Sequence, residues 1–127
     1  MRSVAAILGV NDVQRTTDWF AEKLGFSLVG IFGMPADEGP VYSIVQRGEV
    51  EFHIQIRRRE VWTGPREEIE TDAYVRVSDA DALHVEYRNA GVSIFRELDD
   101  ADYGMRDFAI ETPDGHRIAF GSPGVDG

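Results

Sequence analysis

Polar side chains that could do chemistry occupy alternate positions in one segment near the middle of the chain. Residues 49–57 place Glu51, His53 and Gln55 on one face of an extended segment, because successive side chains of a strand point to opposite sides. Apolar side chains occupy the other face. A carboxylate beside an imidazole could act as a general base if its surroundings tuned its pKa. A strand face that simply meets water explains the same pattern.

A second acidic group lies near the C-terminus. Asp107 and Glu111 fall on one face of a strand predicted over residues 106–111, and the preceding segment, residues 96–104, is predicted to be an acidic loop. Residues 97–107 carry a net charge of −4, with Arg106 as the sole base. Such carboxylates could serve as bases only if burial raised a pKa, and a solvated pair is the simpler state.

Three aromatic residues lie in segments punctuated by glycine or proline and off the helical stripes: Phe32, Trp62 and Tyr103. Loop aromatics can stack on planar ligands, although each could equally cover the edge of the core. A planar cation would suit aromatic rings placed next to carboxylates. The residues expected to contact a ligand are therefore Phe32, Glu51, His53, Gln55, Trp62, Tyr103, Asp107 and Glu111.

The sequence offers little for metal or nucleophilic catalysis. The chain has three histidines and no cysteine, and no Gly-x-Ser-x-Gly segment occurs. A metal site needs three or four converging ligands, and His53 and Asp72 could supply only two. His84 lies off the apolar stripe of its predicted helix and is expected on the surface. We expect no cofactor and assign no catalytic residue, with a divalent metal held through His53 and Asp72 as the alternative.

The charge balance excludes several partners. Thirteen Lys and Arg residues against 23 Asp and Glu give a net charge of −10, and residues 61–127 alone carry −9. A surface of this sign repels nucleic acid and anionic lipid, and it favours a cationic ligand. An acidic surface that serves solubility alone is the commoner explanation. No apolar run approaches the ~18 residues of a membrane span, so we expect a soluble, cytoplasmic protein.

The predicted elements repeat. Residues 4–10 form an apolar strand that ends at Asn11-Asp12, a helical stripe follows, and Gly25 ends the helix. The order recurs from residue 73, with Ser78-Asp79 as cap, a second helical stripe and Gly91. Turns at Gly48 and Gly115 occupy matching places. Each half therefore reads as strand, helix and three strands, which indicates an internal duplication.

This duplication predicts an α+β fold of two tandem βαβββ modules whose curved mixed sheets enclose a shared cleft. We expect one domain made of a first module at residues 1–58, a linker at 59–69, a second module at 70–121 and a tail at 122–127. Module edges and one side of the cleft would stay open in a monomer, so we expect a homodimer.

Nearly the whole chain resembles the glyoxalase/bleomycin-resistance/dioxygenase family, the vicinal oxygen chelate superfamily. The segments that support the resemblance are VNDVQRTTDWFAEKLGF at residues 10–26, GEVEFHI at 48–54 and YGMRDFAIETPDGHRIAFG at 103–121. The last of these is similar to bleomycin-resistance-type members in particular.

The resemblance also implies where a metal would bind. In the metal enzymes of this superfamily, four strands each supply one ligand, and those positions fall here on Ala5, His53, Asp72 and Ala119. Two alanines cannot coordinate an ion. The resemblance therefore implies a metal-free protein that sequesters a small compound, as antibiotic-resistance members do. The loop aromatics and the acidic charge of the protein indicate that this compound is aromatic and cationic. A metal-dependent lyase, isomerase or dioxygenase with an incomplete ligand set, or a metal-free enzyme with Glu51 or His53 as base, is the alternative.

Overall fold

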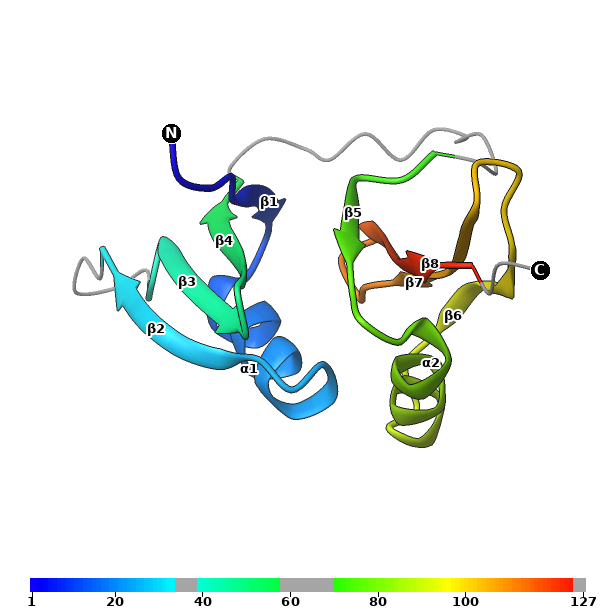
Figure 1. Ribbon diagram of the computed structural model, residues 1–127. Helices are drawn as coiled ribbons and strands as arrows, with labels where there is room; N and C mark the ends of the chain where they lie inside the picture. The colour runs from blue at the N-terminus through cyan, green and yellow to red at the C-terminus, as the bar shows by residue number, and fades with distance from the viewer. Residues whose placement is uncertain (34–38, 58–69, 125–127) are drawn as a thin grey trace. The chain divides into compact units, whose positions relative to one another are not determined.

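The computed structural model describes residues 1–33, 39–57 and 70–124 of the chain. The chain divides into two compact units, Met1–Pro65 and Arg66–Gly127, and each is considered by itself. Each unit consists of one four-stranded mixed sheet with one helix against one of its faces (Figure 1). No helix within the described residues is long and apolar enough to cross a membrane.

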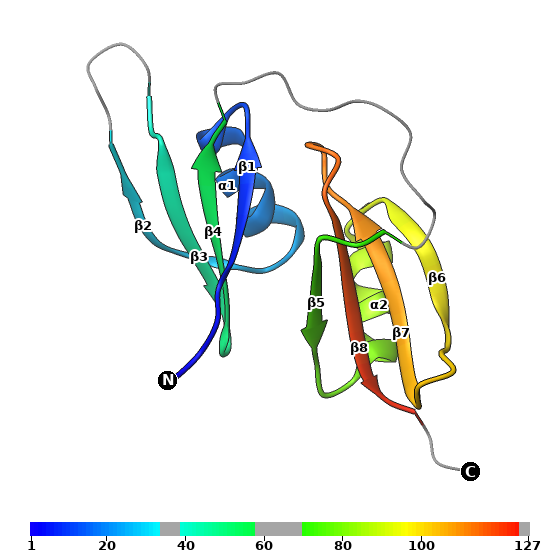
Figure 2. The same cartoon turned by 90° about the horizontal axis from the view of Figure 1, so that it is seen from above.

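The first unit has the strand order β1-β4-β3-β2, in which β1 runs parallel to β4 and the other pairs are antiparallel. Figure 2 shows its four strands side by side with the helix behind them. The elements are β1 (Ala6–Val10), α1 (Val13–Lys23), β2 (Ser27–Phe32), β3 (Tyr42–Arg47) and β4 (Val50–Ile56).

The second unit repeats this topology with the order β5-β8-β7-β6 and a parallel β5–β8 pair. Its elements are β5 (Ala73–Arg76), α2 (Ala80–Asn89), β6 (Ile94–Asp100), β7 (Met105–Glu111) and β8 (Arg117–Pro123). The two predicted βαβββ modules are thus confirmed.

The sequence signals that predicted the two helices are capping residues and glycines, and both act through local backbone geometry. The side chains of Asp12 and Asp79 accept hydrogen bonds from backbone N–H groups three residues later, each at 3.0 Å, and so cap the two helices. After each helix the chain reverses through a glycine with a positive φ, Gly25 at +75° and Gly91 at +80°. The equivalent caps and glycines confirm the repeat at the level of the backbone.

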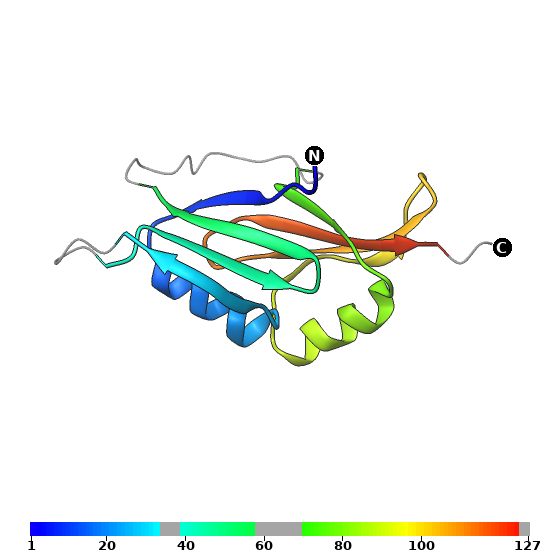
Figure 3. The ribbon, with the colours of Figure 1, turned by 60° about the vertical axis from the view of Figure 1, so that its left-hand side comes forward.

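The helix of the first unit packs on one face of its sheet (Figure 3). Phe20 of α1 contacts Phe26 and Phe52, with ring centroids 5.4 and 5.5 Å apart, and all three side chains are buried. Because Phe52 points toward the helix, its strand neighbours Glu51 and His53 must point away from it. The predicted alternation of β4 is confirmed.

In the second unit Tyr87 of α2 contacts the rings of Phe108 and Phe120 in the same way. The helix-free face of β7 and β8 is also buried, as Asp107, Ala109, Ala119 and Gly121 show. Side chains of the second unit itself cover Asp107, since Tyr74, Arg96 and Tyr103 all contact its carboxylate. The first unit keeps a more open helix-free face, on which His53 is half-buried and Gln55 is exposed.

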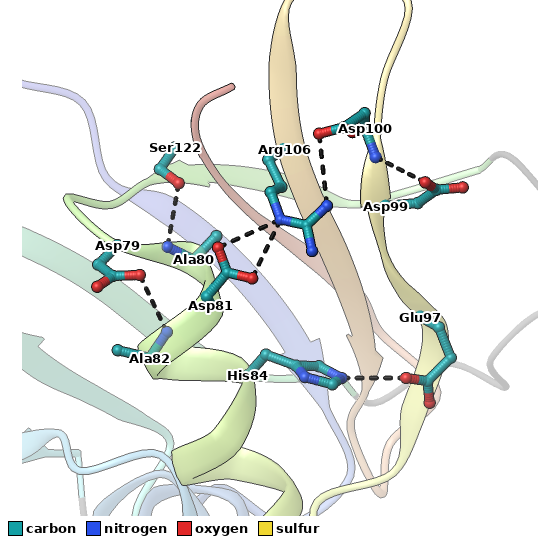
Figure 4. Close-up of polar contacts among 10 residues, drawn as sticks. All are labelled: Asp79, Ala80, Asp81, Ala82, His84, Glu97, Asp99, Asp100, Arg106 and Ser122. Carbon is teal, nitrogen blue, oxygen red and sulfur yellow. Dashed lines mark hydrogen bonds and ion pairs between the residues drawn. The ribbon is translucent and has the colours of Figure 1, made fainter. Parts of the chain in front are cut away.

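Several element boundaries differ from those expected, most clearly at β2, β6 and β8. Strand β2 continues to Phe32, which places that residue in the sheet and not in a loop. Residues 96–100, expected as loop, continue β6 because their backbone pairs with β7 through irregular register shifts. The charged side chains of this segment are tolerated because β6 is an edge strand. Strand β8 includes Ser122 and Pro123, and the Ser122 hydroxyl accepts from the backbone N–H of Ala80 at 3.0 Å (Figure 4).

One buried polar contact offers a test of the packing of α1 on its sheet. The Thr17 hydroxyl donates to the Val13 carbonyl and lies 2.6 Å from the Ser43 hydroxyl, which must then donate to it. We expect Thr17→Val to lower the free energy of unfolding by about 1–3 kcal/mol, because it leaves the Ser43 hydroxyl without an acceptor. The double variant Thr17→Val/Ser43→Ala should recover most of that loss, as measured by urea denaturation. A double variant less stable than the single one would contradict this account.

Candidate functional site

The polar side chains predicted on β4 lie on the helix-free face of the first sheet. Their register neighbours on β3 are Gln46, Ile44 and Tyr42, opposite Glu51, His53 and Gln55 in that order. On the other side β1 places Ile7 beside His53 and Gly9 beside Gln55. Residues from three strands therefore surround His53 on this face.

His53 is held by hydrogen bonds at both ring nitrogens. Its Nε2 lies 2.8 Å from a Glu51 carboxylate oxygen, and its Nδ1 lies 2.5 Å from the Tyr42 hydroxyl. A carboxylate can only accept, so Nε2 carries a proton and Nδ1 of the neutral ring accepts from the phenol. The Tyr42 and His53 rings meet edge to face, with centroids 5.4 Å apart. The three side chains form a continuous chain of carboxylate, imidazole and phenol.

Apolar surface adjoins this chain. Phe32 and Ile7 are exposed by 52% and 58%, and Phe32 is the register partner of Tyr42. The Phe32 ring lies over Gly30, where an added Cβ would approach its Cζ to 2.4 Å. Only glycine at position 30 lets the ring lie against the strand. This face thus combines exposed apolar groups with a few fixed polar atoms.

In the second unit Asp107 is the centre of the polar network. Its side chain is only 1% exposed, yet three donors reach it. Arg96 Nη1 donates to Oδ1 at 2.7 Å, the Tyr74 hydroxyl donates to Oδ2 at 2.9 Å, and the Tyr103 hydroxyl also donates to Oδ2. The carboxylate that was expected to contact a ligand binds three side chains of its own unit.

These contacts shift the ionisation of the network. Burial alone would raise the pKa of Asp107, but hydrogen bonds from Tyr103, Arg96 and Tyr74 outweigh it, so the pKa lies below its usual value. Burial, followed by hydrogen bonds to Tyr103 and Asp107, raises the pKa of Tyr74. The hydrogen bond to Asp107 raises the pKa of Tyr103. At neutral pH the network contains one carboxylate, one guanidinium and two neutral phenols.

Most other acidic side chains near this network also face a cation. Glu111 lies 3.2 Å from Nε of Arg117, whose guanidinium also stacks on Phe95 at 3.9 Å. Arg106 bridges Asp81 and Asp100 (Figure 4). These ion pairs weaken the electrostatic attraction between the acidic segment and a cationic ligand. The formal net charge of residues 97–107 therefore overstates that attraction.

Glu97 of β6 pairs with two side chains of α2. Glu97 pairs with Arg88, a contact that lowers the pKa of Glu97, and it also lies 3.1 Å from His84 Nε2. His84, which was expected on the surface, is only partly exposed. Its side chain is only 13% exposed because its ring packs edge to face on Phe108 at 5.2 Å.

The predicted site residues separate into two groups. Phe32, Glu51, His53 and Gln55 lie in the first unit, whereas Tyr103, Asp107 and Glu111 lie in the second. Trp62 falls outside the described residues. Sequence reasoning missed Tyr42, Tyr74 and Arg96 as polar partners. Tyr74 shares the strand parity of the other polar residues, which could have identified it, but Tyr42 and Arg96 depend on pairing between strands.

The positions at which the family resemblance would place a metal do not fit one. Ala5 and Ala119 carry no donor atom, and both nitrogens of His53 are engaged. The Asp72 carboxylate accepts from the backbone N–H of Arg117 at 2.8 Å and lies 3.6 Å from His116. Within the described part of the chain, no three His, Cys, Asp or Glu side chains are grouped as a metal site would require.

The Asp107 network should make stability depend on pH at both extremes. A carboxyl with a lowered pKa stabilises the fold above its unfolded value of about 3.9, and that contribution is lost as the pH falls through the folded pKa. The raised pKa values of Tyr74 and Tyr103 stabilise the fold below about pH 10, and that contribution is lost as the pH rises through them. We expect Asp107→Asn to cost about 1–3 kcal/mol at neutral pH and to flatten the acid limb, as measured by urea denaturation between about pH 2 and pH 7.

Asp99→Asn is the matched control, because Asp99 is exposed and faces Asp107 across the strand pair. An acid limb that is unchanged in Asp107→Asn would contradict the assigned network.

Solved structures with the same fold include proteins of different kinds. A glyoxalase-related enzyme from Clostridium phytofermentans matches with a TM-score of 0.78 at 22% identity, over 97% of this chain and 95% of that one. The bleomycin-binding protein of Streptomyces verticillus, solved with copper(II)-bleomycin, matches at 0.70 and 24% identity over 94% of both chains. TnmS3, an antibiotic-binding protein from Streptomyces sp. CB03234, matches at 0.65 and 20% identity, over 97% and 98%.

No curated protein matches the sequence. The model of one protein family matches residues 3–120, nearly the whole chain. The chain therefore belongs to the Glyoxalase/Bleomycin resistance protein/Dioxygenase superfamily.

Proposed function

We propose that this protein binds and sequesters a small aromatic compound without a metal ion, on the helix-free faces of its sheets. The observation that carries the proposal is the helix-free face of the first sheet. Phe32 and Ile7 are exposed there by more than half, next to the fixed polar chain of Glu51, His53 and Tyr42. Ligand sites typically combine such apolar surface with a few well-placed polar groups.

The positions of the family's metal ligands support a metal-free site. Two of the four are alanines, and the side chains of His53 and Asp72 already have partners within the protein. Binding would therefore depend on stacking and hydrogen bonds. That a bleomycin-binding protein and an antibiotic-binding protein share the fold is in keeping with this function. The net charge of −10 favours a cationic ligand.

The proposal also includes two other predicted ligand contacts, at Trp62 and Gln55, and a dimeric assembly. Trp62 is expected to add a further aromatic contact, and Gln55, exposed beside Tyr42 in the strand register, offers both a donor and an acceptor. We also propose a homodimer, because each sheet ends in edge strands and the edge strand β2 exposes Leu28 and Val29 by 51% and 57%.

The proposal is tested by a thermal-shift screen of cationic antibiotics, with copper(II)-bleomycin included, and of small aromatic metabolites. Calorimetric titration of the best ligand should then show that Phe32→Leu weakens binding severalfold, because the stacked ring is lost while apolar volume is kept. Val85→Ala is the control, since Val85 is 56% exposed on α2 and belongs to neither sheet. An affinity that Phe32→Leu leaves unchanged would place the binding site away from Phe32. A screen that finds no ligand would overturn the proposal.

The Glu51, His53 and Tyr42 chain favours a second candidate function, a metal-free enzyme that uses His53 as a base. The Nδ1 atom of His53 can take the proton of the Tyr42 hydroxyl, while Glu51 holds Nε2–H and fixes the ring. The phenol oxygen would then be the group that exchanges a proton with the ligand. A metal-dependent reaction is less well supported, because the donor set does not fit.

Ligand turnover separates these functions. An enzyme should convert a ligand from the screen, and Tyr42→Phe and His53→Gln should each abolish conversion while binding persists. A binding protein should release the ligand unchanged from both the wild type and these variants, as mass spectrometry would establish. Elemental analysis of protein purified without chelator tests the metal-dependent alternative, which predicts a stoichiometric divalent metal that is lost in His53→Ala.

A further inference from the structure

The Tyr42 hydroxyl on the helix-free face of the first sheet has its only proton committed to His53. The Glu51 carboxylate accepts from Nε2–H of the ring at 2.8 Å, so Nδ1 of the neutral ring is unprotonated and accepts from the phenol at 2.5 Å. A phenol has one proton and two lone pairs, so its oxygen can still accept a hydrogen bond but cannot donate a second one. Among the described residues, His53 is the one hydrogen-bond partner of this hydroxyl.

The Tyr42 oxygen lies close to exposed aromatic surface. Tyr42 and Phe32 are register partners, and Phe32 is 52% exposed. The Phe32 ring lies over Gly30, whose register partner is Ile44, and the Tyr42 hydroxyl reaches His53, whose register partner is also Ile44. Both side chains therefore lean toward the same row of the sheet. A flat ring that stacks on Phe32 would have the Tyr42 oxygen near its edge.

The fixed polar atoms of this face share one hydrogen-bonding character. The Glu51 carboxylate, whose side chain is 37% exposed, can only accept, and the Tyr42 oxygen at the other end of the chain can only accept as well. Gln55, the exposed register neighbour of Tyr42, carries both a donor and an acceptor and can turn to suit either. The groups that the protein holds in place therefore favour a ligand that donates.

We propose that Glu51 sets the hydrogen-bond polarity of this face by fixing the His53 tautomer that leaves the Tyr42 oxygen an acceptor only. The face then selects aromatic ligands with an N–H donor at the ring edge. This inference rests on the proposed binding function and deepens it, because it names the polar group that the ligand must carry. In this role Glu51 is a positioning residue that acts through His53.

Nitrogen NMR of the His53 ring tests the tautomer in the full chain without any ligand. At about pH 8, where an ordinary imidazole is neutral, the wild type should carry its proton on Nε2 and none on Nδ1. In Glu51→Gln both tautomers should be populated, because an amide can accept from Nε2 or donate to it. Glu49→Gln removes the same charge from an exposed turn residue and should leave the tautomer unchanged. A wild-type ring with a proton on Nδ1 would overturn the inference.

Indole and benzofuran are a matched pair of probes for the selection itself. Both are flat, neutral bicyclic rings of similar size, but indole has a ring N–H where benzofuran has an oxygen. Each is titrated into the full chain, and amide NMR shifts of β3 and β4 give the two dissociation constants. The wild type should prefer indole severalfold more strongly than Tyr42→Phe does, because that variant keeps the aromatic ring and loses the acceptor oxygen.

The effect of Glu51 on this preference separates positioning from direct contact. Glu51→Gln should lower the preference for indole, because the Tyr42 hydroxyl is no longer held as an acceptor, whereas Glu49→Gln should keep it. In the Tyr42→Phe background Glu51→Gln should have no further effect, since its influence passes through the missing hydroxyl. An effect of Glu51→Gln that persists in that background would overturn the positioning role.

The outcomes also separate this inference from the proposed function. A preference for indole that is equal in the wild type and in Tyr42→Phe would overturn the selection for N–H donors, and so would a wild type that binds neither probe. Phe32→Leu should weaken both probes alike, because both stack on the ring. If Phe32→Leu weakens both while the preference is the same in every variant, the binding function stands and the assigned polarity is wrong.

Discussion

Burial of aromatic side chains between one helix and one face of a four-stranded sheet is the interaction on which both units depend. In the first unit Phe20 of α1 meets Phe26 and Phe52, and in the second Tyr87 of α2 meets Phe108 and Phe120. Because strand side chains alternate, covering one face in this way commits the remaining side chains to the other. The helix-free faces are therefore a direct consequence of the core. Within the described part of the chain, the candidate site residues lie on strands of these two sheets, with Tyr103 as the exception.

The duplicated backbone carries two chemically different faces. The first retains exposed apolar side chains beside a hydrogen-bonded chain that ends in the Tyr42 phenol. The second is organised around a buried carboxylate with three donors, where small residues such as Gly121 leave room for larger side chains to lie over the sheet. A repeat therefore preserves topology while the side chains of each copy can diverge in function.

The same divergence explains why membership of the superfamily does not by itself specify chemistry here. The fold is shared by a glyoxalase-related enzyme and by antibiotic-binding proteins. In this chain the donor atoms that a metal would need are missing at Ala5 and Ala119, and the side chains of His53 and Asp72 are already hydrogen-bonded within the protein. Stacking and hydrogen bonding are the interactions that the remaining side chains can offer, which is why binding is the function that they support best.

The sequence by itself determined the two βαβββ modules, their helix caps and the parity of β4, because capping, glycine reversal and alternation are local properties that residues such as Asp12, Gly25 and Phe52 carry wherever the chain folds. It did not determine the end of β6, since pairing with β7 through register shifts overrides the polar character of residues 96–100. Only the tertiary structure decided that the carboxylate of Asp107 is buried and hydrogen-bonded. Strand parity alone had placed it on an open face. Its burial and its partners come from Tyr74, Arg96 and Tyr103, on three segments whose proximity depends on sheet pairing and on the space above Gly121. No local pattern in the sequence specifies such distances between segments, which is why the candidate residues could be named from the sequence but their interactions could not.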